Sequence, residues 1–326
     1  MNVKMSNKSQ RSVLNSTGIE IVSGLTAGFT TTLITHPLDF LKLNLQLDTN
    51  SKNNYAALSK IKNELVLASQ YPNSTVISRS KLIGNIYRGI SPNLIGSTTA
   101  WGLYFMFYKE FKNLTHSTIN SDLFNDESDE KFLNSGHYLM CGFMAGWVTS
   151  IMTNPIWVIK TRMITSRLND TNLPKDYYYK SMVDGILKIY KNEGVKGYYK
   201  GLSPALLNVS QGALQFAIYD TLKNYINNND PLTTFQYLYS SAASKMVSTV
   251  VFYPLQILRS RLQAIPHDNN SLVNRKTMIS VSRDLIQNEG LKGFYKGIDA
   301  NLIRVLPATC ITFIVYEKMK LFLTSV

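Results

Sequence analysis

The side chains in this sequence whose spacing suggests chemistry are charged residues three positions apart, each pair directly following a tyrosine. Two copies join an acid to a base and the third has bases in both places: Asp220 with Lys223, Glu317 with Lys320, and Lys109 with Lys112. Charges at this spacing lie on one face of a helix, and they can also pair between helices as a ring. Exposed ion pairs stabilise a protein by only about 0–1 kcal/mol, so such a ring can open and close without locking.

Nothing in the sequence predicts a catalytic or metal centre. Its four histidines and two cysteines have neither the spacing of metal ligands nor that of a disulfide framework. They are His36, His116, His137, His267, Cys141 and Cys310. No nucleophile–base arrangement or phosphate-binding loop is present either. We therefore expect a protein that is not an enzyme and that holds no metal and no cofactor.

A second motif begins with a proline and occurs three times. Pro37 is followed by Asp39 and Lys42, and later by Gln46. The corresponding residues are Pro155, Trp157, Lys160 and Ile164 in the second copy, and Pro254, Gln256, Arg259 and Gln263 in the third. A proline inside a helix removes a backbone hydrogen bond and kinks the helix. Three such positions at domain-like intervals predict three copies of one helical unit. In the first copy we expect one helix at about 17–46 and a second helix that ends near residue 112.

Hydropathy predicts that these units lie in a membrane. Residues 89–108, 138–159 and 201–219 contain no charged side chain and are 20, 22 and 19 residues long. At about 1.5 Å per residue, each can cross roughly 30 Å of hydrocarbon. The mean hydropathy of −0.07 is low for a lipid-filled bundle. It favours helices that face lipid on one side and water on the other.

The net charge of +13 is located in loops. Residues 42–88, 159–200 and 259–296 contain 23 of the 34 Lys and Arg but only nine of the 21 acids. The acids around 122–130 fall in a connector that would lie on the opposite side of the membrane. This asymmetry follows the positive-inside rule, and no nucleic-acid-binding motif is present. We therefore expect no nucleic-acid partner.

Each repeat also contains an aromatic residue, a base and a glycine where its second helix should begin. The base and glycine are Arg88 and Gly89, Lys200 and Gly201, and Lys296 and Gly297. Backbone N–H groups at a helix start suit an anionic phosphate, so a cardiolipin-like lipid is one interpretation. An interfacial aromatic anchor is the other. Small residues nearby, Gly24-x-x-x-Gly28 and Gly142-x-x-x-Gly146, predict close helix packing.

Together, these motifs resemble those of the mitochondrial carrier family, across residues 17–323. The resemblance implies an all-α membrane protein with six transmembrane helices in three pseudo-threefold repeats, plus three short matrix helices. It places the chain in the mitochondrial inner membrane with both termini towards the intermembrane space, and we expect it to act as a monomer. The expected organisation is a flexible stretch 1–16, repeat 17–113, acidic connector 114–135, repeat 136–224 and repeat 225–326.

In this family the proline-motif charges close the cavity on the matrix side. Carried over, Asp39 would pair with Lys160, as the only full salt bridge of that gate. Trp157 and Gln256 stand where acids are usual, so Trp157 would meet Arg259 by a cation–π contact and Gln256 would hydrogen-bond Lys42. Gln46 and Gln263 occupy the bracing-glutamine position. On the cytosolic side, the resemblance implies three pairings: Asp220 with Lys320, Glu317 with Lys112, and a repulsive Lys109 with Lys223.

The family's central contact positions lie seven residues after the triplet glycine or thirteen before the helix-end acid. They give Gly96, either Leu207 or Asn208, and Arg304. A mid-membrane arginine needs an anionic partner, and its planar fork suits a pyrophosphate; a structural salt bridge is the alternative. Gly96 would leave room for a bulky ring and Asn208 could read its polar edge. Lys245 would add a second cation, unless it snorkels to the lipid edge.

The tryptophan of the second proline motif also resembles carriers of large nucleotides and cofactors. Ser91-Pro92-Asn93, Trp101 to Phe105 and Gln211 to Phe216 look closest to those for flavin adenine dinucleotide (FAD) and folate. We therefore expect an anionic, nucleotide-like substrate, FAD first, with folate, NAD and pyrimidine nucleotides as alternatives. Trp101 and Tyr104 would stack its ring, although aromatic residues facing lipid are as common.

Overall fold

The structure is a computed structural model that describes residues 16–48, 54–70, 78–122, 135–166, 178–226, 234–264 and 277–325 of the chain. The stretch expected to be flexible and the acids at 126–130 lie outside these ranges, apart from residue 16. Long helices dominate. They are α1 (Ser16–Leu47), α4 (Ile90–Asp122), α5 (Ser135–Thr165), α7 (Leu202–Asn208) continued by α8 (Ser210–Ile226), α9 (Thr234–Ala264) and α11 (Ile298–Ser325). With 32 residues, α1 extends about 48 Å, more than the hydrocarbon core of a bilayer.

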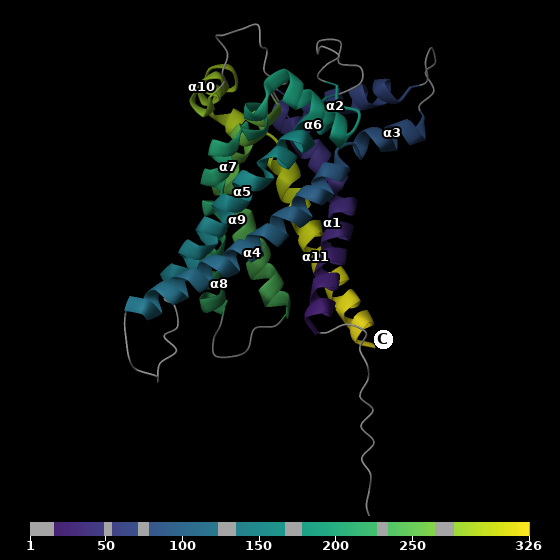
Figure 1. The fold of residues 1–326 in the computed structure, drawn as a ribbon. Coiled ribbons are helices and arrows are strands. Elements are labelled where there is room, and N and C mark those ends of the chain that lie inside the picture. The colour runs from purple at the N-terminus through teal and green to yellow at the C-terminus, as the bar shows by residue number, and fades with distance from the viewer. Residues whose placement is uncertain are drawn as a thin grey trace, which may run out of the picture.

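Short helices follow the first long helix of each repeat (α1, α5 and α9) and gather at one end of the molecule (Figure 1). They are α2 (Asn54–Ser69), α3 (Arg79–Ile86), α6 (Met182–Glu193), η2 (Val195–Tyr199), α10 (Met278–Glu289) and η3 (Leu291–Tyr295). Ser181 caps α6 by accepting a hydrogen bond from the Asp184 amide, and Thr277 forms a capping box with Ser280 at the start of α10. We call this end the short-helix end.

The long helices converge at the short-helix end and spread towards the other, where α1 begins and the chain ends (Figure 1). We call the spread end the terminal end. The most extensive packing joins α1 with α11, α4 with α5, and α8 with α9. Each of these pairs brings together helices from two different repeats. The bundle is therefore held together mainly between repeats.

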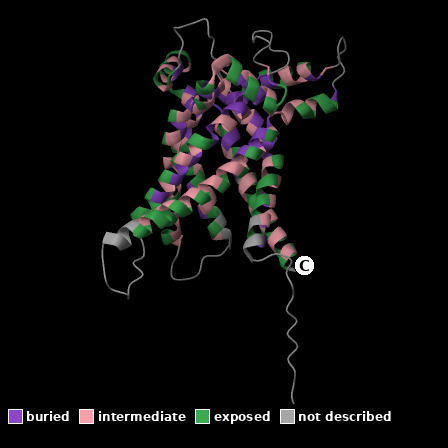
Figure 2. Cartoon of the chain, in the orientation of Figure 1, coloured by how far each residue is buried: buried purple, intermediate pink, exposed green. Residues whose placement is uncertain are grey.

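Buried residues concentrate at the short-helix end (Figure 2). Three apolar clusters share one design, in which residues after the proline of a long helix pack on the short helix that follows. Val158, Ile159 and Met163 of α5 pack with Ile189 of α6. Their counterparts are Phe40 and Leu45 with Ala57 and Ile61, and Ile257, Leu258 and Leu262 with Val281 and Leu285. The three repeats therefore have equivalent cores.

The triplet glycines, which precede α4, α7 and α11, bring the second long helix of each repeat against the proline-motif helix of another repeat. All three have positive φ angles, 78° at Gly89, 73° at Gly201 and 77° at Gly297, which favour glycine. A Cβ atom on Gly201 would lie 3.0 Å from the carbonyl oxygen of Arg259 in α9. Their evident physical role is thus backbone conformation and close helix contact.

Several expectations about helices need correction. Gly24 and Gly28 face open space, whereas Gly142 and Gly146 face other side chains, so only the second pair points at a neighbouring helix. The helix expected to end near residue 112 continues to Asp122. By length and composition, one described helical segment, Leu291–Thr324, passes as a membrane span. Other long helices carry buried polar residues, including Thr35, Asn44, Thr153 and Ser248, which lower their hydropathy.

Candidate functional site

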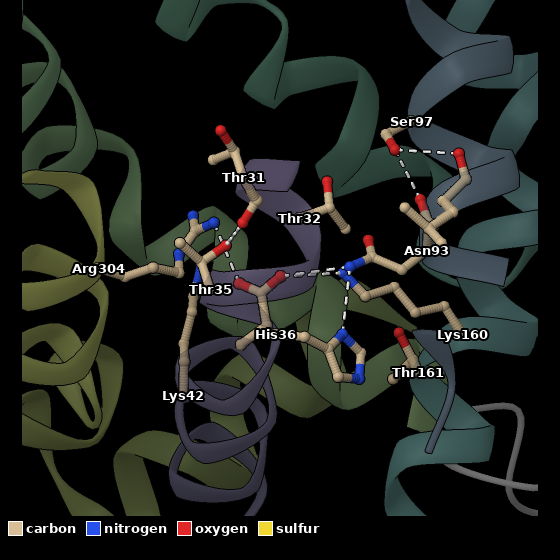
Figure 3. A network of polar contacts seen from close by, with 12 residues as sticks. Thr31, Thr32, Thr35, His36, Lys42, Asn93, Ser97, Lys160, Thr161 and Arg304 are labelled. Carbon is tan, nitrogen blue, oxygen red and sulfur yellow. Dashed lines mark hydrogen bonds and ion pairs between the residues drawn. The ribbon is translucent and has the colours of Figure 1, made fainter. Parts of the chain in front are cut away.

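At the short-helix end, three long helices meet around one carboxylate. Lys160 of α5 lies 3.7 Å from Asp39 Oδ2, and Arg304 of α11 lies 3.0 Å from Asp39 Oδ1 (Figure 3). The Asp39–Lys160 pair was expected, but the second partner was not. Asp39 is therefore not limited to one salt bridge. Arg304 therefore forms a structural salt bridge, which was the alternative to substrate binding that the sequence left open.

The two positions that lack an acid make the neutral contacts that the sequence suggested. The Lys42 ammonium donates to Gln256 Oε1 at 3.2 Å, and Gln256 Nε2 donates to Gln211 Oε1 at 3.2 Å. The Arg259 guanidinium lies 5.9 Å from the centre of the Trp157 ring, and the Lys160 ammonium lies 5.3 Å from the same ring. These contacts and the two ion pairs of Asp39 close the bundle at the short-helix end. We call this layer of side chains the floor. Their role as a gate stays a prediction.

A histidine that the sequence analysis left without a function joins this floor. His36 is fully buried, and its Nε2 lies 3.1 Å from the carbonyl oxygen of Arg88. Asn93 Nδ2 lies 3.4 Å from His36 Nδ1 and 3.5 Å from Asp39 Oδ2. The pattern fits a neutral ring that donates from Nε2 and accepts at Nδ1. Asn93 thus connects α4 to the proline motif of α1.

The expected bracing glutamines bind neighbouring repeats. Ser260 Oγ donates to Gln46 Oε1 at 2.8 Å, and Gln46 Nε2 donates to the Tyr253 hydroxyl at 3.2 Å. Gln263 Oε1 accepts from Thr161 at 3.0 Å. Both glutamines are buried. Ile164, at the third position, has an apolar side chain that forms no such hydrogen bond.

Behind the floor lie two buried ion pairs that the sequence analysis missed. Arg162 makes a two-pronged contact with Glu193, at 2.6 and 2.9 Å, and Arg261 makes the same contact with Glu289, at 2.5 and 2.9 Å. Burial raises the pKa of Glu193, but hydrogen bonds and charge from Arg162, with the charge of Lys200, outweigh it and leave the pKa below its ordinary value. We call these pairs the clamps. Two repeated patterns in the sequence could have predicted the clamps. One is an arginine seven residues after the proline, and the other is a glutamate followed by glycine, at 193–194 and 289–290.

The predicted cytosolic gate residues lie towards the terminal end, where the helices are apart, and their expected ion pairs are not among the salt bridges of the described residues. Lys320 instead lies 3.8 Å from Glu20 and 5.8 Å from the Tyr316 ring centre. Lys112 lies over the Tyr138 ring at 5.5 Å. Lys109, Asp220 and Glu317 are exposed, and Lys223 is partly exposed. The floor is thus closed while the terminal end is spread.

A cavity of about 530 Å³ opens between α8, α9 and α11 on the terminal side of the floor. Its lining combines aromatic rings with small polar groups: Gln215, Phe216, Tyr219, Tyr237, Ser241, Ser244, Phe313 and Glu317. Cavities of this size accept small molecules or one part of a larger ligand. Gln215, Phe216 and Glu317 belong to motifs found in the sequence, but the lining itself was not predicted, because this shared face depends on the packing of three helices.

Polar atoms without partners mark two of the predicted central positions. Among the described residues, Asn208 Oδ1 and Arg304 Nε are buried and make no hydrogen bond. Asn208 also ends α7, and the helix resumes at Ser210. Broken helices inside membranes are tolerated where they line a cavity. Lys245, an exposed residue of α9, lies near enough to Arg304 for the two cations to repel each other, and its role at the centre stays a prediction.

Other predicted central positions are arranged differently. A Cβ on Gly96 would lie 2.9 Å from Ile156 and 3.5 Å from Trp157, so α5 fills the space expected for a substrate ring. Leu207 is 51% exposed, whereas Asn208 is partly buried. Trp101 is 64% exposed and stacks on Phe105.

One further predicted position is occupied by contacts within the protein. Tyr104 packs beside Gly142 of α5 and stacks on Tyr108, so a helix contact occupies it.

The triplet bases are engaged within the protein. Arg88 donates to the carbonyl oxygen of Tyr179 at 2.7 Å and lies over the Tyr178 ring. Lys200 pairs with Glu193 at 3.0 Å, and Lys296 pairs with Asp48 and Glu289. Because of these partners, lipid binding by the basic side chains requires either shared or exchanged contacts. It stays a prediction.

Comparison with known proteins gives the family. The sequence profile described as mitochondrial carrier protein matches residues 15–118, 131–230 and 230–326. The mitochondrial FAD carrier protein of Saccharomyces cerevisiae is 40% identical over 92% of this chain and 96% of its own length. A chloroplastic folate transporter of Arabidopsis thaliana is 31% identical (91% and 92%), and a mitochondrial nicotinamide adenine dinucleotide transporter of S. cerevisiae is 32% identical (94% and 78%). The chain therefore belongs to the mitochondrial carrier family, as an all-α membrane transporter of three repeats that is not an enzyme and needs no cofactor.

Proposed function

We propose that this chain carries FAD across the mitochondrial inner membrane by alternating access. The observation that supports this best is a floor rich in cations beneath a cavity lined with aromatic rings. A dinucleotide needs both environments, since its diphosphate is anionic and its rings are flat and apolar. The FAD, folate and nicotinamide adenine dinucleotide transporters among its relatives handle molecules with flat ring systems.

In the proposed binding mode, the phosphates approach Arg304 and Lys245 while a ring enters the aromatic cavity. Phe313 follows Arg304 by nine residues on α11, which separates them by about 14 Å along the helix. That span suits an extended dinucleotide better than a mononucleotide. Asn208, with its unpaired carbonyl oxygen, is placed to accept a hydrogen bond from the substrate.

The spread terminal end and closed floor describe one state of the transport cycle. Both termini would face the intermembrane space, which then opens directly to the cavity. Closure of the terminal end would bring the predicted cytosolic gate together while the floor opens to the matrix. Weak surface ion pairs suit this step because neither state is locked. We further propose a monomer, with cardiolipin bound at the helix starts that follow Gly89, Gly201 and Gly297.

Uptake into proteoliposomes tests this function. Saturable FAD uptake is expected, and it should be lost in Arg304→Ala and partly kept in Arg304→Lys, which preserves the charge. Arg283→Ala is the matched control, because Arg283 is exposed on α10 away from the cavity. Competition by folate, NAD and pyrimidine nucleotides ranks the alternatives, since the true substrate competes at the lowest concentration. Absence of flux for every nucleotide would refute the proposal.

A further inference from the structure

The floor of the cavity holds more positive than negative charge. Three cations, Lys42, Lys160 and Arg304, lie around the carboxylate of Asp39, and a fourth, Arg259, lies near Lys42 and Lys160. Lys42 lies close enough to Asp39 and to the other three cations for their charges to act on it. Trp157 and Gln256 stand where two further acids would balance this charge.

Two of these cations have neutral partners. Lys42 donates to Gln256 Oε1 at 3.2 Å, and Arg259 lies over the ring of Trp157 at 5.9 Å. Neither forms a salt bridge within the described part of the chain. Arg304 is paired with Asp39 at one nitrogen, but its buried Nε has no partner. Unbalanced cations inside a membrane protein are costly and mark places where an anion binds.

We propose that Lys42, Arg259 and the unpartnered Nε of Arg304 form a subsite for the diphosphate of the substrate. The phosphates then supply the negative charge that Trp157 and Gln256 do not. This inference rests on the proposed function, and it deepens that function by including floor residues in the binding site. The two negative charges of a diphosphate would balance the excess positive charge of the floor.

Gln256 offers a near-isosteric test of the charge. Its Oε1 already accepts from Lys42, so Gln256→Glu places a carboxylate beside that ammonium without adding bulk. The new carboxylate would compete with a diphosphate for the same cation. Gln256→Ala removes the hydrogen bond but adds no charge. It therefore separates loss of the glutamine from gain of the acid.

The experiment measures binding to the purified full chain in detergent by calorimetry. The probes are inorganic pyrophosphate, FAD and riboflavin, which has no phosphate. We expect wild type to bind pyrophosphate and FAD, and Gln256→Glu to weaken both at least tenfold. Gln256→Ala should change them less than threefold. Gln287→Glu, on the exposed surface of α10, is the control for net charge and should bind like wild type.

The outcomes separate the subsite from the substrate. If Gln256→Glu binds FAD and pyrophosphate as tightly as wild type, the subsite is wrong. If wild type binds and transports FAD but does not bind pyrophosphate, the subsite is also wrong, while the proposed function stands. Binding of pyrophosphate that falls in Gln256→Glu, with no FAD binding or flux, would support the subsite and refute FAD as the substrate.

Discussion

Neutralising Glu193 should destabilise the carrier far more than neutralising an exposed acid. Glu193 accepts two hydrogen bonds from Arg162 and pairs with Lys200 at 3.0 Å, and the side chains of Glu193 and Arg162 are 1% and 2% exposed. Breaking a buried pair from one side costs about 3–5 kcal/mol, because a buried charge loses its partner. At roughly 2 °C per kcal/mol, Glu193→Gln should lower the thermal midpoint by about 6–10 °C.

The assay is thermal unfolding of the detergent-purified chain. Asp184→Asn is the matched control, since Asp184 forms a partly exposed i,i+4 pair with Lys188 on the same short helix. Such a pair contributes about 0–1 kcal/mol, so its loss should change the midpoint by no more than about 2 °C. Equal midpoints for Glu193→Gln and Asp184→Asn would refute the reasoning.

The same variant should change the acid sensitivity of the protein. Despite its burial, Glu193 has a pKa below its ordinary value of 4.5, because Arg162 and Lys200 favour the carboxylate. A lowered pKa in the folded state gives stability that is present above the unfolded pKa and is lost as the pH falls through the folded one. Between pH 6 and pH 3, wild type should therefore lose stability that Glu193→Gln never had. Parallel curves would contradict this.

Three other changes have expected outcomes. Gly201→Ala should lower the thermal midpoint because a Cβ there meets the backbone of α9 and φ is positive, at a cost of about 1–3 kcal/mol; Gly212→Ala, with open space around it, should not. Asp39→Asn should slow FAD uptake at least about tenfold, since the floor loses its carboxylate; an unchanged rate would exclude a role for this charge. Phe313→Ala should raise the KM for FAD about tenfold through lost stacking and leave pyrophosphate binding unchanged.

The features that the sequence predicted well are local. Pro37, Pro155 and Pro254 and the triplet glycines located the repeats, and the first helix was expected at 17–46 against an observed Ser16–Leu47. The end of α4 was missed, because beyond residue 112 the helix has no long apolar run to show it. The length of an apolar run predicts a membrane span, but it does not predict how far the helix continues beyond the membrane.

Contacts between distant helices were harder to predict. Counting from motifs gave the level of Gly96 and Arg304 along their helices, but not what each side chain faces. Gly96 proved to face α5, and Arg304 turned to Asp39, 265 positions earlier in the chain. Helix rotation and rotamer choice decide such contacts, and both depend on packing that one sequence does not express.

The strong ion pairs are distributed unequally among the repeats. The first repeat supplies the carboxylate of the floor, Asp39, but Asn44 stands where the clamps have an arginine, and Asn44 donates to its own helix at Phe40. The second and third repeats have the clamps Arg162–Glu193 and Arg261–Glu289, but they have Trp157 and Gln256 at the floor. The second and third repeats thus contribute their acids at the clamps, whereas the first contributes Asp39 at the floor and Asp48 in a buried pair with Lys296. Because the clamps lie away from the cavity, they can hold the short-helix end together while the floor charges remain available to an anionic substrate.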